Sequence, residues 1–281
     1  MEPISTIEGP GGDDPFVSDP PAHPWPPTSV ELPLVSGGHR LLNSALLPAG
    51  TGPHPVVLLL HGFPGHDTWQ DLAQVLRRAG YAAVTPHYRG SWGSPGSWSW
   101  AAALDDARAV VTALRDDARF DGGRISLVGH SFGGFVALQT LAADPTLDAA
   151  VSIAGFDFGR ARREVGEPGG RARYEQAWGG LLAPLRGTTA RALVDEMMSQ
   201  GERWSLPALA PHLTGRRVLL VGTGRDQVTP AAHHHAPVAE AFRRHGVALS
   251  ATVLDTDHAL ADSRVRAARE VLQFLGPARR S

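Results

Sequence analysis

The sequence contains no cysteine among its 281 residues and no lysine, so all 26 of its basic residues are arginine. Without cysteine the chain has no thiol nucleophile, no disulfide and no thiolate metal site. Its formal net charge of −2 gives it no basic excess of the kind that binds nucleic acid. No run in it approaches the roughly 18 apolar residues that span a membrane. We therefore expect a soluble protein with neither a nucleic-acid nor a membrane partner.

The N-terminal segment, MEPISTIEGPGGDDPFVSDPPAHPWPP, is acidic and rich in proline. A secretory signal peptide has a basic start and an apolar middle, which is the opposite pattern. A segment of this composition buries too little apolar surface to offset the entropy lost on ordering. We expect residues 1–27 to form a flexible tail or an arm wrapped on the surface. Residues 28–281 then form a single domain of a cytoplasmic protein.

From residue 55 onward, fully apolar segments alternate with amphipathic ones. The apolar segments predict strands at residues 55–62, 81–90, 124–131, 147–157, 216–222 and 248–255. The amphipathic segments predict helices at residues 68–80, 99–117, 133–144, 230–246 and 262–276. Ahead of them, residues 30–50 predict a hairpin of two strands that turns at Gly37 and Gly38. This alternation is typical of an α/β fold with a mostly parallel, doubly wound sheet covered on both faces.

The alternation is interrupted at residues 159–211. This stretch has several arginines, Gly-Gly pairs, two short helical segments and little strand propensity. We expect it to be a helical cap insertion over the carboxyl edge of the sheet, where ligands bind in such folds.

The segment Gly129-His130-Ser131-Phe132-Gly133 fits the pattern G-x-S-x-G and lies between a predicted strand and a predicted helix. A turn this tight forces its central residue toward positive φ, which is costly for a residue with a Cβ atom. The flanking glycines leave room for the neighbouring backbone. The pattern predicts that the Ser131 hydroxyl faces a cleft, at a helix N-terminus that favours developing negative charge.

A serine nucleophile needs a base, and the base needs a carboxylate that orients it. In this architecture the chain order is serine, acid, histidine, each after a strand. Asp226 follows the strand at residues 216–222, and His258 follows the last strand. We expect Ser131, Asp226 and His258 to form a catalytic triad, with Asp157, which also follows a strand, as the alternative acid.

Other histidines are interpreted structurally. His130 is expected to pack away from the cleft, and residues 233–235 to form a solvated helix face and not a metal site. No metal site is expected elsewhere.

An oxyanion hole requires two backbone N–H groups that point at the tetrahedral intermediate. We expect one from Phe132, the residue after the nucleophile. The second is expected from the loop that follows residues 55–62. Because Pro64 has no N–H, Phe63 is the expected donor and Gly65 the reserve.

Three tryptophans, Trp92, Trp98 and Trp100, lie in or just after the loop that follows residues 81–90. They are candidates for an apolar or aromatic acyl pocket. The alternative is that these rings pack the loop against the cap, because tryptophan is often buried.

With HGFPG, GHSFGG, GTGRDQVTP and DTDHAL in this order, the chain resembles the α/β-hydrolase superfamily over residues 30–277. HYRGSWGSPGS is similar to the YRGS-x-G loop of prolyl-oligopeptidase and acylaminoacyl-peptidase catalytic domains and of dienelactone-hydrolase-like esterases. Serine at position 131 argues against dehalogenases and epoxide hydrolases, whose elbow carries aspartate.

The resemblance implies a two-step acyl transfer without metal or organic cofactor, in which Ser131 attacks a carbonyl with His258 as base. The expected substrate is a small-molecule ester. A short peptide-like substrate or a thioester is the alternative on the same triad. A further interpretation is a non-catalytic binding module with this fold; loss of a triad member is its usual sign, and none is missing here.

Overall fold

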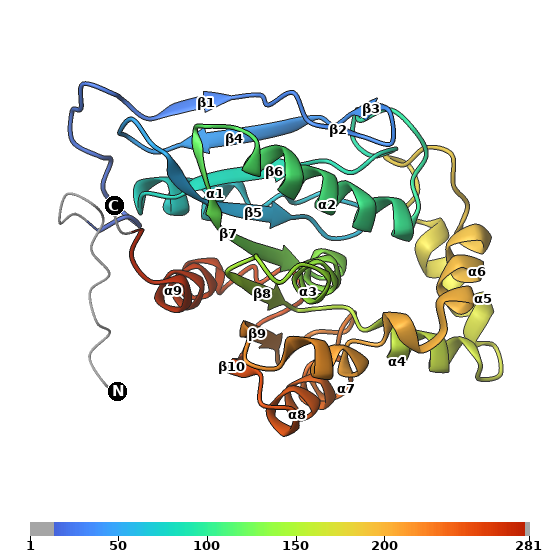
Figure 1. The fold of residues 1–281 in the computed structure, drawn as a ribbon. Helices are drawn as coiled ribbons and strands as arrows, with labels where there is room; N and C mark the ends of the chain where they lie inside the picture. Colours follow the sequence, from blue (N-terminus) through green and yellow to red (C-terminus); the bar gives the residue numbers. More distant parts are fainter. Residues whose placement is uncertain (1–13, 279–281) are drawn as a thin grey trace.

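The computed structural model describes residues 14–278. Within these residues, eight strands form one sheet in the order β1-β4-β6-β5-β7-β8-β9-β10 (Figure 1). The strands are β1 (Thr28–Val30), β4 (Asn43–Leu47), β5 (His54–Leu60), β6 (Ala82–Pro86), β7 (Phe120–His130), β8 (Ala149–Ile153), β9 (Arg217–Thr223) and β10 (Ala248–Leu254). Strand β4 pairs antiparallel with β1 and β6, whereas all the other pairs are parallel.

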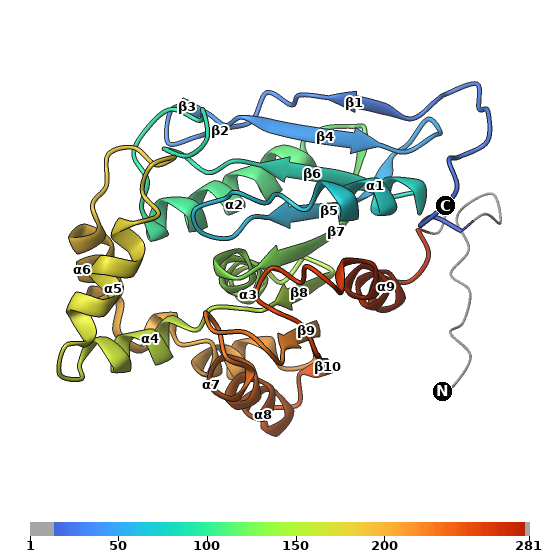
Figure 2. The same ribbon diagram turned by 180° about the vertical axis from the view of Figure 1, so that it is seen from behind.

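Helices cover both faces of this sheet (Figures 1 and 2). They are α1 (Gln70–Arg78), α2 (Trp100–Arg115), α3 (Phe132–Ala143), α8 (Ala236–Arg244) and α9 (Arg264–Leu275). The apolar side chains of α2, α3 and α8 belong to one buried cluster, and those of α1 and α9 belong to another. The predicted mostly parallel, doubly wound α/β fold is therefore confirmed.

The parallel strands explain why the apolar runs are continuous. Every residue of β5, β6 and β8 is buried, because helices pack on both sides of the strands. β10 lies at the edge of the sheet and is less buried, with Val253 exposed. Because these strands run the same way, β5, β7, β8, β9 and β10 all end at one edge.

Two local predictions need correction. The turn at Gly37 and Gly38 joins β2 (Val35–Ser36) to β3 (His39–Arg40) in a separate two-stranded sheet, whereas the longer β4 pairs with β1 and β6. The expected helix at residues 230–246 is divided into α7 (Ala231–His234) and α8. The break precedes Pro237, which lacks the N–H of a continuous helix and restricts the residue before it.

The N-terminal segment falls partly outside the described residues, since the predicted flexible tail at 1–27 is described only from residue 14. From there it contacts the α1 and α9 side of the domain. The Pro15 carbonyl accepts a hydrogen bond from Arg78, and the Arg269 guanidinium lies 4.3 Å from the centroid of the Phe16 ring. These contacts agree with a wrapped arm in this part of the segment.

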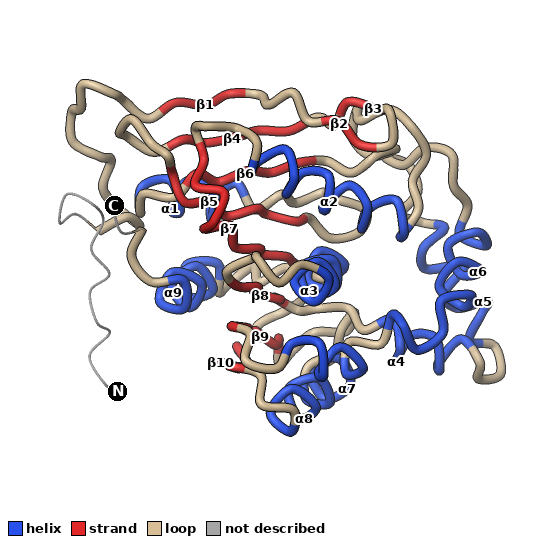
Figure 3. The backbone as a smooth tube through the Cα atoms, viewed as in Figure 1, coloured by secondary structure: helices blue, strands red, loops and turns tan. Residues whose placement is uncertain are grey.

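The segment between β8 and β9 folds over the carboxyl edge of the sheet (Figure 3). It contains three α-helices and two 3₁₀ helices, more than the two short helices expected: α4 (Phe158–Val165), α5 (Gly170–Gly179), α6 (Ala190–Gln200), η1 (Gly201–Trp204) and η2 (Pro207–Leu213). We call residues 158–213 the cap. None of the helices among residues 14–278 has the length and apolar character needed to cross a membrane.

The cap is attached to the domain at the start of α2. The Glu196 carboxylate of α6 accepts hydrogen bonds from the N–H groups of Trp100 and Ala101, at 3.0 and 2.8 Å. These are among the first N–H groups of the helix, which lack intrahelical acceptors. Arg186 adds backbone hydrogen bonds with Gly90 and Trp98. The cap is thus joined to the domain by backbone as well as side-chain contacts.

A buried ion pair holds the loop after β6. The Asp106 side chain of α2 is 1% exposed and accepts from the Arg89 guanidinium at 2.5 Å and from the Arg89 backbone N–H at 2.7 Å. Removing one partner of a buried pair leaves an uncompensated charge, which is strongly destabilising.

We predict that Asp106→Ala lowers the free energy of unfolding by about 3–5 kcal/mol, measured by urea denaturation. The matched control is Asp105→Ala at the adjacent position, where the carboxylate is exposed and pairs with Arg108 on the helix surface. This control is expected to change stability by no more than about 0.5 kcal/mol. Equal effects of the two substitutions would contradict the assignment.

Candidate active site

Ser131 lies at the turn from β7 into α3 with φ of 55° and ψ of −118°, a strained conformation for a residue with a Cβ atom. The turn is tight enough to require glycine on both sides. A Cβ atom on Gly129 would lie 1.9 Å from the Gly133 carbonyl oxygen, and one on Gly133 would lie 1.9 Å from that of Leu60. The local sequence therefore places a serine side chain at the carboxyl edge of the sheet.

Three side chains from distant loops meet at this edge. The His258 Nε2 atom lies 3.0 Å from the Ser131 Oγ atom, and His258 Nδ1 lies 2.7 Å from Asp226 Oδ2. An ionised carboxylate only accepts hydrogen bonds, so Nδ1–H donates to Asp226. In the neutral ring Nε2 is then the acceptor for the serine hydroxyl. The structure thus brings together the side chains of Ser131, Asp226 and His258.

Asp226 is held as an anion. Burial opposes its ionisation, but hydrogen bonds from His258 and from the hydroxyls of Thr223 and Thr229 hold its pKa well below the usual 3.8. The backbone N–H groups of Val228 and Thr229 also donate to its Oδ1 atom, at 2.7 and 2.9 Å. Asp226 therefore offers a fixed negative charge to His258.

The alternative acid, Asp157, has a different position. Its carboxylate caps α4 by accepting from the N–H groups of Gly159 and Arg160, and it accepts from the Leu206 N–H at 2.8 Å. The carboxylate oxygens of Asp157 thus accept hydrogen bonds from backbone N–H groups of the cap, whereas His258 Nδ1 contacts Asp226. The geometry therefore favours Asp226 over Asp157 as the orienting acid.

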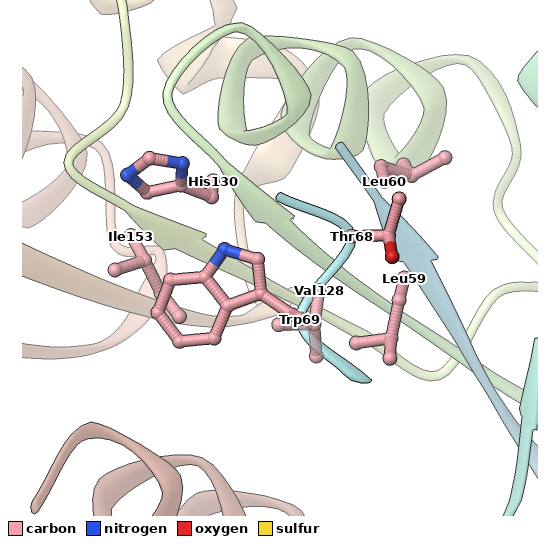
Figure 4. A pocket seen from close by; sticks show the side chains of 7 residues that line it. All are labelled: Leu59, Leu60, Thr68, Trp69, Val128, His130 and Ile153. Atoms are coloured by element: carbon pink, nitrogen blue, oxygen red, sulfur yellow. The ribbon is translucent and has the colours of Figure 1, made fainter. Parts of the chain in front are cut away.

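His130 does more than fill space, which corrects the expectation that it only packs. Its Nε2 atom lies 2.7 Å from the backbone carbonyl oxygen of His258, and the two ring centroids are 4.9 Å apart. The His130 ring also lies beside that of Trp69, at a centroid distance of 5.4 Å (Figure 4). The gap among these side chains is too small for a water molecule. His130 thus holds the main chain that carries His258.

The expected oxyanion donors border the nucleophile. Phe132 is the first residue of α3, so its N–H has no intrahelical acceptor. Phe63 lies in the loop after β5, which approaches the serine so closely that a Cβ atom on Gly62 would be 3.2 Å from Ser131 Cβ. The Trp92 indole N–H donates to the Pro64 carbonyl at 2.8 Å and holds this loop.

The three tryptophans divide into two groups. Trp98 and Trp100 are 2% and 1% exposed and belong to the buried core. Trp100 packs 4.8 Å from the Phe132 ring, and its indole N–H donates to the Leu193 carbonyl of the cap. Their burial leaves almost no surface for a substrate, so packing is the better interpretation. Trp92 is 38% exposed and remains accessible.

A pocket of about 400 Å³ lies between the cap and the segment after Asp226. Its lining residues are Phe156, Glu164, Arg173, Tyr174, Ala177, Trp178, Gln227, Val228, Pro230, His233 and His234. The Phe156 N–H donates to the Ser131 carbonyl at 3.1 Å, and the Trp178 ring lies 6.3 Å from that of Phe63. Phe156 and Trp178 therefore connect the pocket to the turn that carries Ser131 and to the loop that carries Phe63, although neither Ser131 nor His258 lines it. Sequence patterns gave no signal for it, because its walls combine the cap with segments that are distant in sequence.

One histidine of this pocket contradicts the sequence interpretation. Residues 233–235 were expected on a solvated face, but His234 is only 5% exposed. Its Nδ1 atom accepts a hydrogen bond from the Asp157 N–H at 3.0 Å. The partner of His234 lies 77 positions earlier in the chain, so the local sequence around residue 234 could not reveal this contact.

Comparison with known proteins agrees with the fold. Residues 57–272 match the model of the alpha/beta hydrolase family, and the chain belongs to this family. It is 31% identical over 130 residues to an uncharacterized 31.7 kDa protein of Escherichia coli, covering 43% of this chain and 46% of that protein. It is 30% identical over 145 residues to 2,6-dihydropseudooxynicotine hydrolase of Paenarthrobacter nicotinovorans, covering 46% and 36%. The matches thus span less than half the length of these curated relatives.

Solved structures show the same architecture. An esterase of Pyrococcus furiosus superposes with a TM-score of 0.65 at 17% identity, covering 89% of this chain and 91% of that one. A puromycin-hydrolyzing peptidase of Mycobacterium tuberculosis superposes with a TM-score of 0.68 at 21% identity, covering 89% and 39%. At these identities the likeness establishes the fold.

Three histidines around the site predict a loss of stability in mild acid. Burial lowers the pKa of His61 to about 3, and that of His130 and of His234 to about 4. Below their unfolded value of 6.5, the unfolded chain binds protons that the folded chain does not. We predict that the free energy of unfolding falls between pH 6.5 and 5, by up to about 1.4 kcal/mol per pH unit for each histidine. Urea denaturation at pH 7, 6 and 5 measures this, and a flat profile would contradict it.

Proposed function

We propose that this chain is a serine hydrolase that cleaves carboxylic esters through an acyl-enzyme on Ser131. The observation that carries the proposal is the continuous relay of 3.0 and 2.7 Å contacts from the Ser131 hydroxyl through His258 to the Asp226 carboxylate. Such a relay provides a nucleophile, a base and the group that orients the base. Membership of the alpha/beta hydrolase family supports the same class of reaction.

In the first step, Ser131 Oγ attacks the ester carbonyl carbon while its proton passes to His258 Nε2. The carbonyl π electrons move to oxygen, and the backbone N–H groups of Phe63 and Phe132 stabilise this oxyanion. Asp226 stabilises the imidazolium. When the tetrahedral intermediate collapses, the C–O bond to the alcohol breaks and the alkoxide takes the proton from His258. The acyl group remains on Ser131.

In the second step, water replaces the alcohol. His258 removes a proton from water as the oxygen attacks the acyl carbon, and the same oxyanion site is used. The intermediate collapses with return of the proton to Ser131 Oγ, and the carboxylic acid leaves. The pocket beside Phe156 and Trp178 provides space for one arm of the ester.

The first prediction of this mechanism concerns the nucleophile. Ser131→Ala is expected to abolish covalent labelling by a fluorophosphonate probe and to lower hydrolysis of p-nitrophenyl acetate by about 10⁴-fold or more. The control is Ser126→Ala, which removes a similarly buried hydroxyl from the same strand. The control protein is expected to react normally. Absence of labelling in well-folded wild-type protein would instead indicate a binding module.

The second prediction separates the two candidate acids. Asp226→Asn is expected to lower kcat by about 10³-fold or more, because an amide does not hold His258 in the required tautomer. Asp157→Asn retains an oxygen that can accept from the cap and should keep kcat within about threefold. The reverse result would assign the acid to Asp157. Comparing p-nitrophenyl esters with aminoacyl anilides in the same assays separates ester from peptide specificity, and faster anilide cleavage would overturn the ester assignment.

A further inference from the structure

Aromatic and apolar side chains line part of the pocket between the cap and the segment after Asp226. Phe156, Tyr174 and Trp178 supply three aromatic rings, and Val228 and Pro230 face them from the segment after Asp226. The rings of Tyr174 and Trp178 pack edge to face at 5.3 Å. Walls of this kind bury a planar apolar group. A cavity of about 400 Å³ accommodates one aromatic ring with a substituent.

His234 presents a single hydrogen-bond donor to this pocket. Its Nδ1 atom accepts from the Asp157 N–H, so Nδ1 carries no proton. A neutral imidazole has one N–H group, which must then be on Nε2. The Phe156 ring lies against the imidazole at a centroid distance of 5.3 Å, and burial lowers the pKa of His234 to about 4. The ring is therefore neutral at neutral pH, with a fixed orientation and a fixed tautomer.

The Nε2–H group is left for a ligand. Among residues 14–278, no acceptor forms a hydrogen bond with His234 Nε2, and the side chain lines the pocket. The neighbouring carboxylate of Glu164 accepts from the Arg160 guanidinium at 2.7 Å and from the Tyr174 hydroxyl at 2.6 Å, and no hydrogen bond joins it to His234 within residues 14–278. A donor that faces a pocket binds water there, and a ligand oxygen that displaces this water can take the same hydrogen bond.

The charge of the pocket favours an uncharged ligand group. Although burial opposes its ionisation, hydrogen bonds from Tyr174 and Arg160 keep the pKa of Glu164 below its usual value, so it is an anion at neutral pH. Its partner Arg160 balances this charge, and Arg173, which also lines the pocket, lies 3.9 Å from the Glu167 carboxylate. A substrate carboxylate placed beside Glu164 would meet repulsion. The remaining acceptor is a neutral oxygen, such as that of an ether or a ketone.

We propose that His234 is a specificity-determining residue whose Nε2–H binds a neutral acceptor oxygen on an aromatic arm of the substrate. This inference rests on the proposed esterase activity and names its substrate class: esters with an aromatic arm that carries an uncharged hydrogen-bond acceptor. The site is formed by the cap and α7, whereas the triad comes from the loops of the sheet.

The test compares esters that differ by one acceptor. On the acyl side these are p-nitrophenyl phenylacetate and its ring-methoxy and ring-acetyl derivatives at each position. On the alcohol side they are benzyl acetate and the same derivatives. We expect one substituted ester to exceed its unsubstituted parent in kcat/KM by about 5- to 10-fold, the value of one hydrogen bond. Ethyl acetate, which has no aromatic arm on either side, reports on the triad.

Two substitutions separate the donor from the structural contact. His234→Asn places an amide oxygen where Nδ1 accepts from Asp157 and has no atom at the Nε2 position. His234→Gln places an amide N–H near the Nε2 position and loses the Nδ1 acceptor. We expect the preference to fall to within twofold of unity in His234→Asn and to persist in His234→Gln. Circular dichroism and fluorophosphonate labelling show whether each variant is folded with a reactive Ser131.

Each outcome decides the inference. Wild-type activity without preference for any substituted ester, or a preference that persists in folded His234→Asn, would overturn the role of His234 and leave the esterase intact. Wild-type protein inactive on every ester would overturn the proposed function and this inference with it. If His234→Asn does not fold, NMR of the wild-type protein decides. The ligands are non-hydrolysed amides that correspond to the preferred substituted ester and to its unsubstituted parent. The His234 Nε2–H resonance should shift when the substituted amide is added and not when the parent amide is added.

Discussion

The site depends on a steric constraint at the end of β7. The chain turns from strand to helix so sharply that Ser131 takes a positive φ and the carbonyl groups of Leu60 and Gly133 occupy the space where neighbouring Cβ atoms would lie. Packing of β5, β7 and α3 stabilises this strained conformation. The same packing aims the hydroxyl at the edge where β9 and β10 end. Asp226 and His258 then need only short loops to reach it.

This constraint explains how far the sequence could predict the site. Glycine spacing identified the turn, and apolar runs identified the strands that Asp226 and His258 follow, so a shared edge was predictable. The same logic could not separate Asp226 from Asp157, because both follow parallel strands. The difference depends on contacts of the loops. The hydroxyls of Thr223 and Thr229 hold the Asp226 carboxylate beside His258, whereas the Asp157 carboxylate accepts a hydrogen bond from Leu206 of the cap.

The cap was less predictable, for a physical reason. Its helices are short and bury their faces against segments distant in sequence, so their periodicity does not reveal their partners. Trp100 illustrates this, because it begins α2 and its indole bonds to Leu193 of α6. Trp100 is thus a core residue although its sequence position suggested a substrate pocket. His130 packs as expected, but its hydrogen bond to the carbonyl of His258, 128 positions away, was not predictable from the local sequence.

Asp157 connects these parts even though His258 does not contact it. Its carboxylate caps α4 and accepts from the Leu206 N–H just before η2, which joins the start of the cap to a segment near its end. Its N–H fixes the tautomer of His234, so the residue that anchors the cap also determines which hydrogen-bonding group faces the pocket. The preceding residue, Phe156, lines the pocket and donates a backbone hydrogen bond to the Ser131 carbonyl. The same short stretch of backbone therefore contacts both the pocket and the nucleophile turn. A substitution at Leu206 that moves Asp157 would therefore alter the position of His234 in the pocket, whereas Asp226 and His258 make no hydrogen bond with Asp157.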